Sequence, residues 1–216
     1  MKKGIFILPA IVCFCCTKKT EVIKNDKESF SNQRTTLETS LRRPTASTSF
    51  IKYTIQQGAH SCDQSTVKSV SGTSMNFVAK FDSTAIYPAV ITDYNHAYDV
   101  NKLYGFSEGF SNQYNSARIG WRWFDGELQL FAYVYTKGTL LRDPISYDPP
   151  FIKSVEIGKE INCSIAISGG TYIFTVDGVT VTTSRGTTSG KYSGYQQYPY
   201  FGGTLTAPHL INIYIK

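Results

Sequence analysis

Two aromatic runs around a two-residue turn constrain the fold of this chain more than any other feature. The stretch Arg118 to Tyr135 reads RIGWRWFDGELQLFAYVY, with Asp125-Gly126 at its centre. Alternating runs joined by Asp-Gly are the strongest local signal for a β-hairpin. Because bulky residues occupy both alternating sets of positions, the stretch predicts a central hairpin with one side in a core and an aromatic second side.

The alternation divides the side chains of this hairpin between two faces. The face expected in the core carries Ile119, Trp121, Trp123, Leu128, Leu130, Ala132 and Val134. For the two tryptophans, core packing is our interpretation and a sugar-binding platform is the alternative. The opposite face is the better ligand surface, and its candidate binding residues are Arg118, Arg122, Tyr133 and Tyr135.

The rest of the chain from Ser49 onward is also predicted to be β. Short alternating runs are separated by Gly, Pro, Asp and Asn, Asp177-Gly178 marks a second tight hairpin, and no convincing helical stripe is present. The further candidate strands are Phe50–Gln56, Met75–Phe81, Ser154–Ile157, Ile161–Ser168, Thr171–Val176, Val179–Thr183, Tyr195–Phe201 and Leu210–Ile215. This spacing predicts one all-β domain over residues 49–216, a two-sheet antiparallel sandwich of the jelly-roll type.

Residues 1–16, MKKGIFILPAIVCFCC, have the pattern of an export signal. Two lysines precede an apolar stretch that is too short to span a bilayer as a helix. Because cysteines end this stretch, it resembles a bacterial lipoprotein signal. Cys16 is the expected lipidation site, although Cys15 and Phe14 depart from the usual pattern, and Cys13 is the fallback. An ordinary signal peptide or an uncleaved anchor is the alternative, and each interpretation implies export. The lipoprotein interpretation places the domain on the cell envelope, anchored to the outer membrane on its surface or periplasmic side.

Residues 17–48 are predicted to form a flexible tether, because they contain one aromatic residue and many polar and charged ones. The chain has 22 basic and 16 acidic residues, of which nine and four precede Pro44. The remainder is therefore nearly neutral, with 13 basic and 12 acidic residues. A nucleic-acid-binding domain would need a basic surface, so that class of partner is excluded.

Two cysteines follow the signal, Cys62 and Cys163. Export permits a disulfide between them, whereas the core position expected for Cys163 also suits a free thiol. Both alternatives remain open from the sequence.

A 30-residue stretch from Tyr87 to Ser116 shows no clear strand, and long loops are often functional. Its composition adds Tyr94, His96 and Tyr98 to the candidate ligand-binding residues, and a covering loop whose aromatic residues pack on the sheet is the alternative. Asp93, His96 and Asp99 are spaced so that a turn would gather them, but no ordered metal-ligand motif is present. We therefore expect no metal and no cofactor.

Four segments together resemble a group of exported sandwich proteins of glycan-foraging Gram-negative bacteria. The segments are FIKYTIQQGAHS (50–61), FVAKFDSTAIY (77–87), WRWFDGELQLFAYVY (121–135) and YPYFGGTLTAPHLINIYIK (198–216). This group is similar in shape to concanavalin A-like lectins, glucanases and jelly-roll polysaccharide lyases. The resemblance implies the fold and a polysaccharide or oligosaccharide partner, but it carries no catalytic signature.

Catalytic motifs are incomplete in this sequence. The E-x-D-x-x-E strand of lectin-like glucanases is absent, as are the Q-[IV]-H and R-[ST]-E-x-R motifs of jelly-roll alginate lyases. Residue types suited to a lyase do occur, at His60, His96, Arg118, Tyr195, Gln197 and His209. The leading hypothesis is a lipid-anchored protein that binds carbohydrate without turnover. The alternatives are a polysaccharide lyase or glycoside hydrolase on the same fold, and an envelope component with a protein partner.

Overall fold

The computed structural model describes residues 49–88 and 99–216, which form two antiparallel β-sheets. The first sheet, sheet A, has the strand order β1 (Ile51–Ile55), β13 (Ile211–Ile215), β3 (Ser74–Phe81), β9 (Ile161–Ser168), β10 (Thr171–Val176) and β11 (Val179–Ser184). The second sheet, sheet B, has the order β2 (Ser69–Gly72), β12 (Tyr192–Gln197), β4 (Asn101–Glu108), β5 (Ser116–Phe124), β6 (Glu127–Thr136) and β7 (Thr139–Leu140). A further strand, β8 (Phe151–Val155), pairs with β6.

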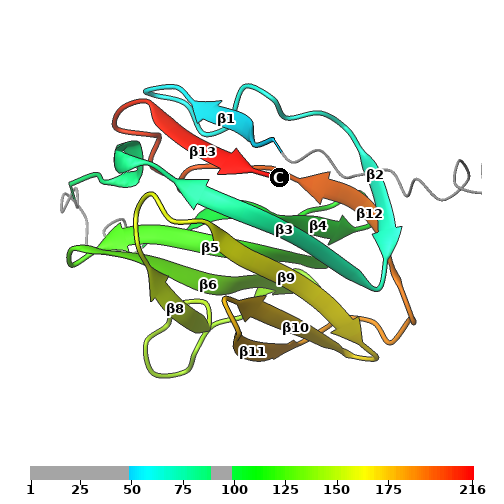
Figure 1. Cartoon of the computed structure of the whole chain (residues 1–216). Helices are drawn as coiled ribbons and strands as arrows, with labels where there is room; N and C mark the ends of the chain where they lie inside the picture. Colours follow the sequence, from blue (N-terminus) through cyan, green and yellow to red (C-terminus); the bar gives the residue numbers. More distant parts are fainter. Residues whose placement is uncertain (1–48, 89–98) are drawn as a thin grey trace, which may run out of the picture. The chain divides into compact units, whose positions relative to one another are not determined.

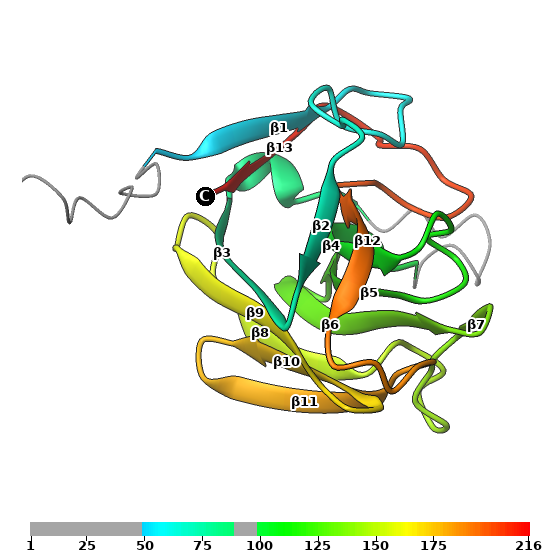
Figure 2. The same ribbon diagram turned by 90° about the vertical axis from the view of Figure 1, so that its right-hand side faces the viewer.

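Strands from distant parts of the sequence are neighbours in both sheets. The first strand pairs with the last, β1 with β13, and β3 pairs with β9 (Figure 1). In sheet B, β12 lies between β2 and β4. Figure 2 shows the strands of sheet A on one side and those of sheet B on the other, and the buried core residues come from both sheets. This two-layer arrangement with crossing connections confirms the predicted jelly-roll sandwich.

The tight hairpins form where the sequence predicts them. Asp125 and Gly126 both have positive φ, 52° and 77°, as do Asp177 and Gly178, at 43° and 82°. Two successive positive φ values give the turn whose twist matches that of the flanking strands, and Gly adopts them without strain. These turns set the register of β5 with β6 and of β10 with β11.

The predicted faces of the central hairpin are confirmed. Ile119 and Trp121 are fully buried, as are the four alternating aliphatic residues of β6 from Leu128 to Val134. Trp121 packs against Phe81 of sheet A with ring centroids 5.1 Å apart, and Trp123 is half-buried against the same core. Core packing is therefore the role of the tryptophans, and the outer face of sheet B carries the arginines and tyrosines.

The prediction that 87–116 has no strand was wrong, because β4 (Asn101–Glu108) lies in the middle of sheet B. The pairing of β4 with β5 shifts between Lys102 and Tyr104, so a β-bulge at Leu103 interrupts the period of two. Leu103 and Tyr104 consequently both belong to the core. A bulge destroys the alternation on which the sequence-based prediction of a strand depends.

Other differences concern the ends of strands and short edge strands. The strand predicted at Tyr195–Phe201 is β12, at Tyr192–Gln197, and that predicted at Ser154–Ile157 is β8, at Phe151–Val155. The short strands β2 and β7 were missed. Edge strands are only half covered and bury few residues, so their alternation is weak.

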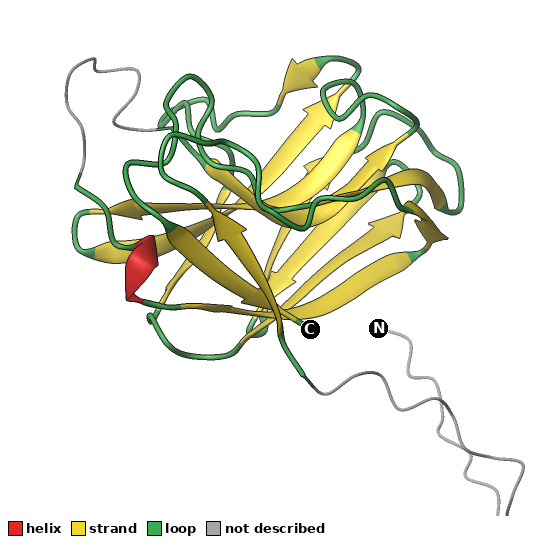
Figure 3. Cartoon of the chain, turned by 90° about the horizontal axis from the view of Figure 1, so that it is seen from above, coloured by secondary structure: helices red, strands yellow, loops and turns green. Residues whose placement is uncertain are grey.

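Cys62 and Cys163 are free, buried thiols, so the structure favours the second of the two alternatives for these cysteines. Burial raises the pKa of both thiols and keeps them protonated. The helical part of the described chain is one short 3₁₀ turn at Ser83–Ala85 (Figure 3). Within residues 49–88 and 99–216, we find no helix of the length and apolar character that crossing a bilayer would require.

Candidate functional site

The outer face of sheet B forms the floor of a groove. Arg118 of β5 lies directly between Gly105 of β4 and Tyr133 of β6 in the strand register. Lys102 of β4 lies opposite Gly120, two residues further along β5. Because residues two apart on a strand point the same way, these side chains share the outer face. The hairpin thus brings Arg118, Tyr133 and Tyr135 together, as the sequence predicts.

Glycine at position 120 keeps this floor low. A Cβ atom there would lie 2.6 Å from Cγ1 of Val100 and 3.2 Å from Cβ of Tyr133. The first distance is too short for a real contact, so a larger residue would displace its neighbours. The missing side chain lets the ring of Tyr133 lie close to the sheet.

Lys102 is held by the segment that follows β12. Its backbone N–H and C=O pair with the C=O and N–H of Tyr200, at 2.9 Å each. Its Nζ donates to the carbonyl oxygen of Gly202 at 2.6 Å and lies 4.9 Å from the ring centroid of Tyr133 and 5.7 Å from that of Tyr200. Burial lowers the pKa of Lys102 to about 8; nearby Asp99 opposes this shift and Arg118 adds to it.

Arg118 is a buried cation without a carboxylate partner in the described part of the chain. Only 6% of the residue is exposed, and its guanidinium carbon lies 4.9 Å from the ring centroid of Tyr133. Nη2 donates to the carbonyl oxygen of Asn112 at 3.3 Å, whereas Nε has no hydrogen-bond partner among the described residues. Burial lowers the pKa of Arg118, and the neighbouring Tyr133 and Tyr135 oppose this effect.

A groove of about 340 Å³ opens above these two cations. Its walls come from β4, β5, β6, β12 and three loops, and they are aromatic, amide-bearing and hydroxyl-bearing. Its lining includes Lys102, Arg118, Tyr133, Tyr135, Gln197 and Tyr200. A wider depression of about 760 Å³ adjoins this groove, since Tyr133 and Tyr135 line both.

Arg122, the fourth candidate from the hairpin, lies in the adjoining depression in a different environment. Its Nη1 and Nη2 donate to the two carboxylate oxygens of Asp148 at 3.0 and 2.8 Å, and Nε donates to Gln129 at 2.9 Å. The structure therefore places Arg122 apart from Arg118, in a bidentate ion pair.

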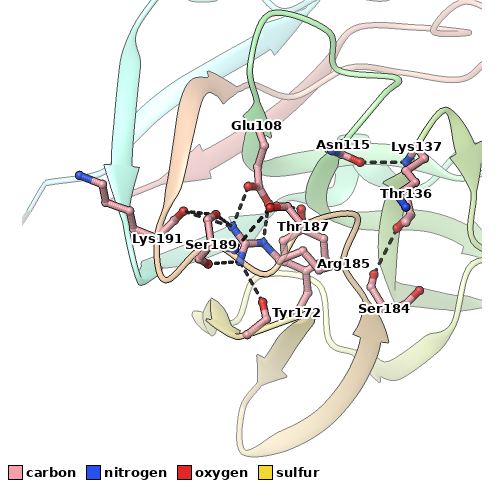
Figure 4. Close-up of polar contacts among 11 residues, drawn as sticks. Glu108, Asn115, Thr136, Lys137, Tyr172, Ser184, Arg185, Thr187, Ser189 and Lys191 are labelled. Carbon is pink, nitrogen blue, oxygen red and sulfur yellow. Dashed lines mark hydrogen bonds and ion pairs between the residues drawn. The ribbon is translucent and has the colours of Figure 1, made fainter.

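A third buried arginine, Arg185, belongs to a polar cluster at the end of β4 (Figure 4). Nε and Nη2 donate to the two oxygens of Glu108 at 2.7 Å each, and Tyr172 also donates to this carboxylate. The remaining donors reach the carbonyl oxygens of Gly169 and Ser189 and other groups of the same loop. This cluster is saturated by its own contacts and ties the β11–β12 connection to the sandwich.

The remaining candidates from the sequence have separate locations. Tyr94, His96 and Tyr98 lie outside the described residues, as does Cys16. Among the residue types suited to a lyase, Gln197 lines the groove and donates to Ser107 at 3.3 Å. Arg118 lines it as well, whereas Tyr195 lies beside the exposed ring of Phe110, His60 is stacked on Tyr200, and His209 lies against the carbonyl oxygen of Thr84.

Two groove residues, Lys102 and Tyr200, were missed by sequence reasoning. Lys102 lies in the segment that was predicted to be a loop, and Tyr200 follows the observed end of β12. Their proximity results from pairing across about a hundred residues, since Lys102 and Gly202 are 100 positions apart. The alternation in Tyr195–Phe201 was the available signal, but it did not identify the partner strand.

Metal ligation finds no support in the described part of the chain, where no cluster of three or more His, Cys, Asp or Glu side chains occurs. Of the three residues considered for a cation, Asp93 and His96 lie outside the described range. The third, Asp99, accepts a hydrogen bond from the backbone N–H of Gly203.

Comparison with known proteins gives similarities of structure at low sequence identity. No family model matches the chain, and no curated protein matches its sequence. The family 7 alginate lyase A1-II′ with bound product is 10% identical, with a TM-score of 0.46 over 77% of this chain and 76% of that one. A 1.0 Å structure of the same lyase is 12% identical, with a TM-score of 0.39 over 74% and 60%. A β-glucanase from Bacillus licheniformis is 13% identical, with a TM-score of 0.34 over 77% and 75%. Lyases and glucanases are among the classes that the sequence resembles.

Proposed function

We propose that this protein is an exported, lipid-anchored protein whose β-sandwich domain binds a polysaccharide or oligosaccharide without turnover. The binding site is the groove on the outer face of sheet B. The observation that carries the proposal is the joining of Arg118, Tyr133 and Tyr135 with Gln197 and Tyr200 around one open groove.

The side chains of this groove match the two kinds of surface that a sugar presents. Sugar rings have apolar C–H faces that pack on aromatic rings, and hydroxyl groups that need hydrogen-bond partners. Tyr133 and Tyr135 lie together with ring centroids 6.0 Å apart, and Tyr200 contributes a third ring. The amides of Asn112, Gln113 and Gln197 provide donors and acceptors beside them.

The composition of the groove supports binding over hydrolysis. A glycoside hydrolase needs two carboxyl groups across the scissile bond. Among the described residues that line the groove around Arg118, none is Asp or Glu. Binding without hydrolysis is the function that this set of side chains supports best.

Retention of the full-length protein on a panel of immobilised glycans tests the proposal. We expect at least one glycan to retain the protein without release of reducing or unsaturated ends. Tyr135→Ala should weaken retention, since it removes one of the paired rings. Tyr214→Ala is the matched control, because Tyr214 lies on sheet A. Failure of every glycan on the panel to retain the protein would overturn the proposal.

A polysaccharide lyase is the second candidate, favoured by the state of Lys102. In a lyase reaction a base removes the proton next to the substrate's carboxylate, the glycosidic C–O bond breaks, and the leaving oxygen takes up a proton. A buried amine with a pKa of about 8 is partly uncharged near neutral pH, and the adjacent Arg118 would neutralise the carboxylate. Accumulation of unsaturated ends with the wild type, and its loss in Lys102→Met, would establish this candidate.

The anchor is tested independently of the groove. Cys16→Ala should abolish labelling of the protein by radioactive palmitate and release it from the membrane fraction. Cys13→Ala is the control and should be labelled like the wild type. Labelling that survives in Cys16→Ala and disappears in Cys13→Ala would move the anchor to the other cysteine.

A further inference from the structure

Lys102 and Arg118, the two cations of the groove, lack the ion pairs that the other buried arginines make. Arg122 and Arg185 each make bidentate ion pairs, with Asp148 and Glu108. Within residues 49–88 and 99–216, no ion pair joins Arg118 or Lys102 to a carboxylate. Buried charges are ordinarily paired, so two unpaired cations side by side are an unusual feature.

Their geometry concentrates positive charge at one place in the groove. Nζ of Lys102 and the guanidinium carbon of Arg118 each lie 4.9 Å from the centroid of the same ring, that of Tyr133. Both residues are 6% exposed, so water screens them poorly. The fold thus holds two like charges around one aromatic ring, although they repel each other.

Few protein groups offset this charge: Asp99 lies near enough to Lys102 to oppose the lowering of its pKa, but it makes no ion pair with Lys102 or Arg118. Lys102 donates to one carbonyl oxygen, that of Gly202, and Arg118 to another, that of Asn112. The Nε atom of Arg118 is buried without a partner among the described residues. Carbonyl oxygens and aromatic rings carry only partial negative charge, so an anion entering the groove would gain from both cations.

We propose that this groove recognises an anionic sugar, whose carboxylate or sulfate group binds between Lys102 and Arg118 beside the ring of Tyr133. This inference rests on the proposed function, since it names the class of glycan that the same groove takes. The sugar ring that carries the acid group packs on Tyr135 and Tyr200, which are partly exposed, whereas Tyr133 is buried and contacts the two cations. Arg122 does not take part, because Asp148 already neutralises it.

Matched acidic and neutral probes separate this inference from carbohydrate binding in general. The full-length protein is titrated with oligogalacturonate and with its fully methyl-esterified form, which differ in charge on the same sugar backbone. Dextran sulfate and dextran form the second pair and distinguish sulfate from carboxylate. We expect one acidic probe to bind and its neutral counterpart to bind at least about tenfold more weakly, since charged hydrogen bonds are lost.

Substitutions assign the effect to the two cations. Arg118→Met and Lys102→Met should each weaken binding of the acidic probe about 10- to 100-fold and change binding of the neutral probe much less. Lys52→Met removes a charge from an exposed position on sheet A and should leave the affinity unchanged. Arg118→Lys, which keeps the charge, provides a second test if Arg118→Met does not fold.

Three results would overturn the inference. If the neutral probes bind as tightly as the acidic ones, carbohydrate binding stands but acid recognition does not. If the acidic probes bind and both methionine variants retain full affinity, the anion binds elsewhere. If neither acidic nor neutral probes bind while other glycans of the panel do, the groove does not select an acidic sugar.

Discussion

Arg185 and Arg118 are both buried in the sandwich, yet they differ in the number and length of their hydrogen bonds and in the direction of their pKa shifts. Arg185 makes two hydrogen bonds of 2.7 Å with Glu108 and several more with the loop at residues 185–191. Arg118 has one hydrogen bond of 3.3 Å to a carbonyl oxygen. Hydrogen bonding to Glu108 raises the pKa of Arg185, whereas burial lowers that of Arg118.

This difference distinguishes a structural charge from a charge available to a ligand. The Arg185 cluster stabilises the fold because each partner neutralises the other and their hydrogen bonds are satisfied. At Arg118 the fold retains a buried cation without such compensation. Keeping such a residue costs stability, and the proposed ligand would supply the interactions that Arg118 lacks.

The largest expected effect on stability comes from a substitution in the Arg185 cluster. Arg185→Met should lower the free energy of unfolding by about 3–5 kcal/mol, because it leaves the Glu108 carboxylate buried without its cation. Denaturant unfolding measures this change. Lys216→Met is the control, since its ion pair with Glu160 is exposed and should contribute less than about 1 kcal/mol. If both substitutions lowered the free energy of unfolding equally, the Arg185 cluster would not be a special source of stability, and its contrast with Arg118 would fail.

An intermediate effect is expected at Arg122, which resembles Arg185 in its pairing but lies nearer the surface. The side chains of Arg122 and Asp148 are 8% and 16% exposed. Arg122→Met should therefore lower the free energy of unfolding by about 1–3 kcal/mol. A change smaller than that of Lys216→Met, in the same denaturation assay, would contradict a structural role for this pair.

A smaller effect is expected from Lys102, and it depends on pH. Raising the pH should increase the free energy of unfolding, whereas the two substitutions above lower it. Its pKa in the folded protein is about 8, below its usual value of 10.5. Below pH 8 the amine is charged in both states, and the folded state bears the full unfavourable burial. Between these pKa values the unfolded chain binds more protons, so the contribution of Lys102 to stability rises with pH.

The measurement is the difference in unfolding free energy between the wild type and Lys102→Met, followed from roughly pH 7 to 10. The difference should shift in favour of the wild type by at most about 1.4 kcal/mol per pH unit. Taking the difference removes the titration of Cys62 and Cys163, which both proteins share. A difference that does not change with pH would show that Lys102 is not desolvated.

The smallest effect on stability is expected at Arg118. Arg118→Met should change the free energy of unfolding by less than about 1 kcal/mol, or raise it, because methionine is apolar and no buried carboxylate loses a partner. Thermal and denaturant unfolding beside Arg185→Met test this expectation. Destabilisation as large as that of Arg185→Met would show that Arg118 is part of the framework and weaken its assignment to a ligand.

Part of this site could be predicted from the sequence. The hairpin places Arg118 and Tyr133 opposite each other on β5 and β6, because Asp125-Gly126 sets the register and alternation sets the faces. The same reasoning could not separate Arg118 from Arg122, which share that face. Their difference depends on Asp148, which lies 26 positions along the chain from Arg122 and outside the hairpin.

The sequence by itself determined the two-layer β-sandwich, the tight hairpins and the inward side of β5 and β6, since alternation and turn chemistry act between near neighbours. Only the tertiary structure decided that β4 lies beside β5, that Tyr200 packs near Lys102, and which arginine meets a carboxylate. Arg185 and Glu108, for example, are separated by 77 positions. Contacts across such distances depend on how whole strands pair, and no local pattern encodes that choice of partner.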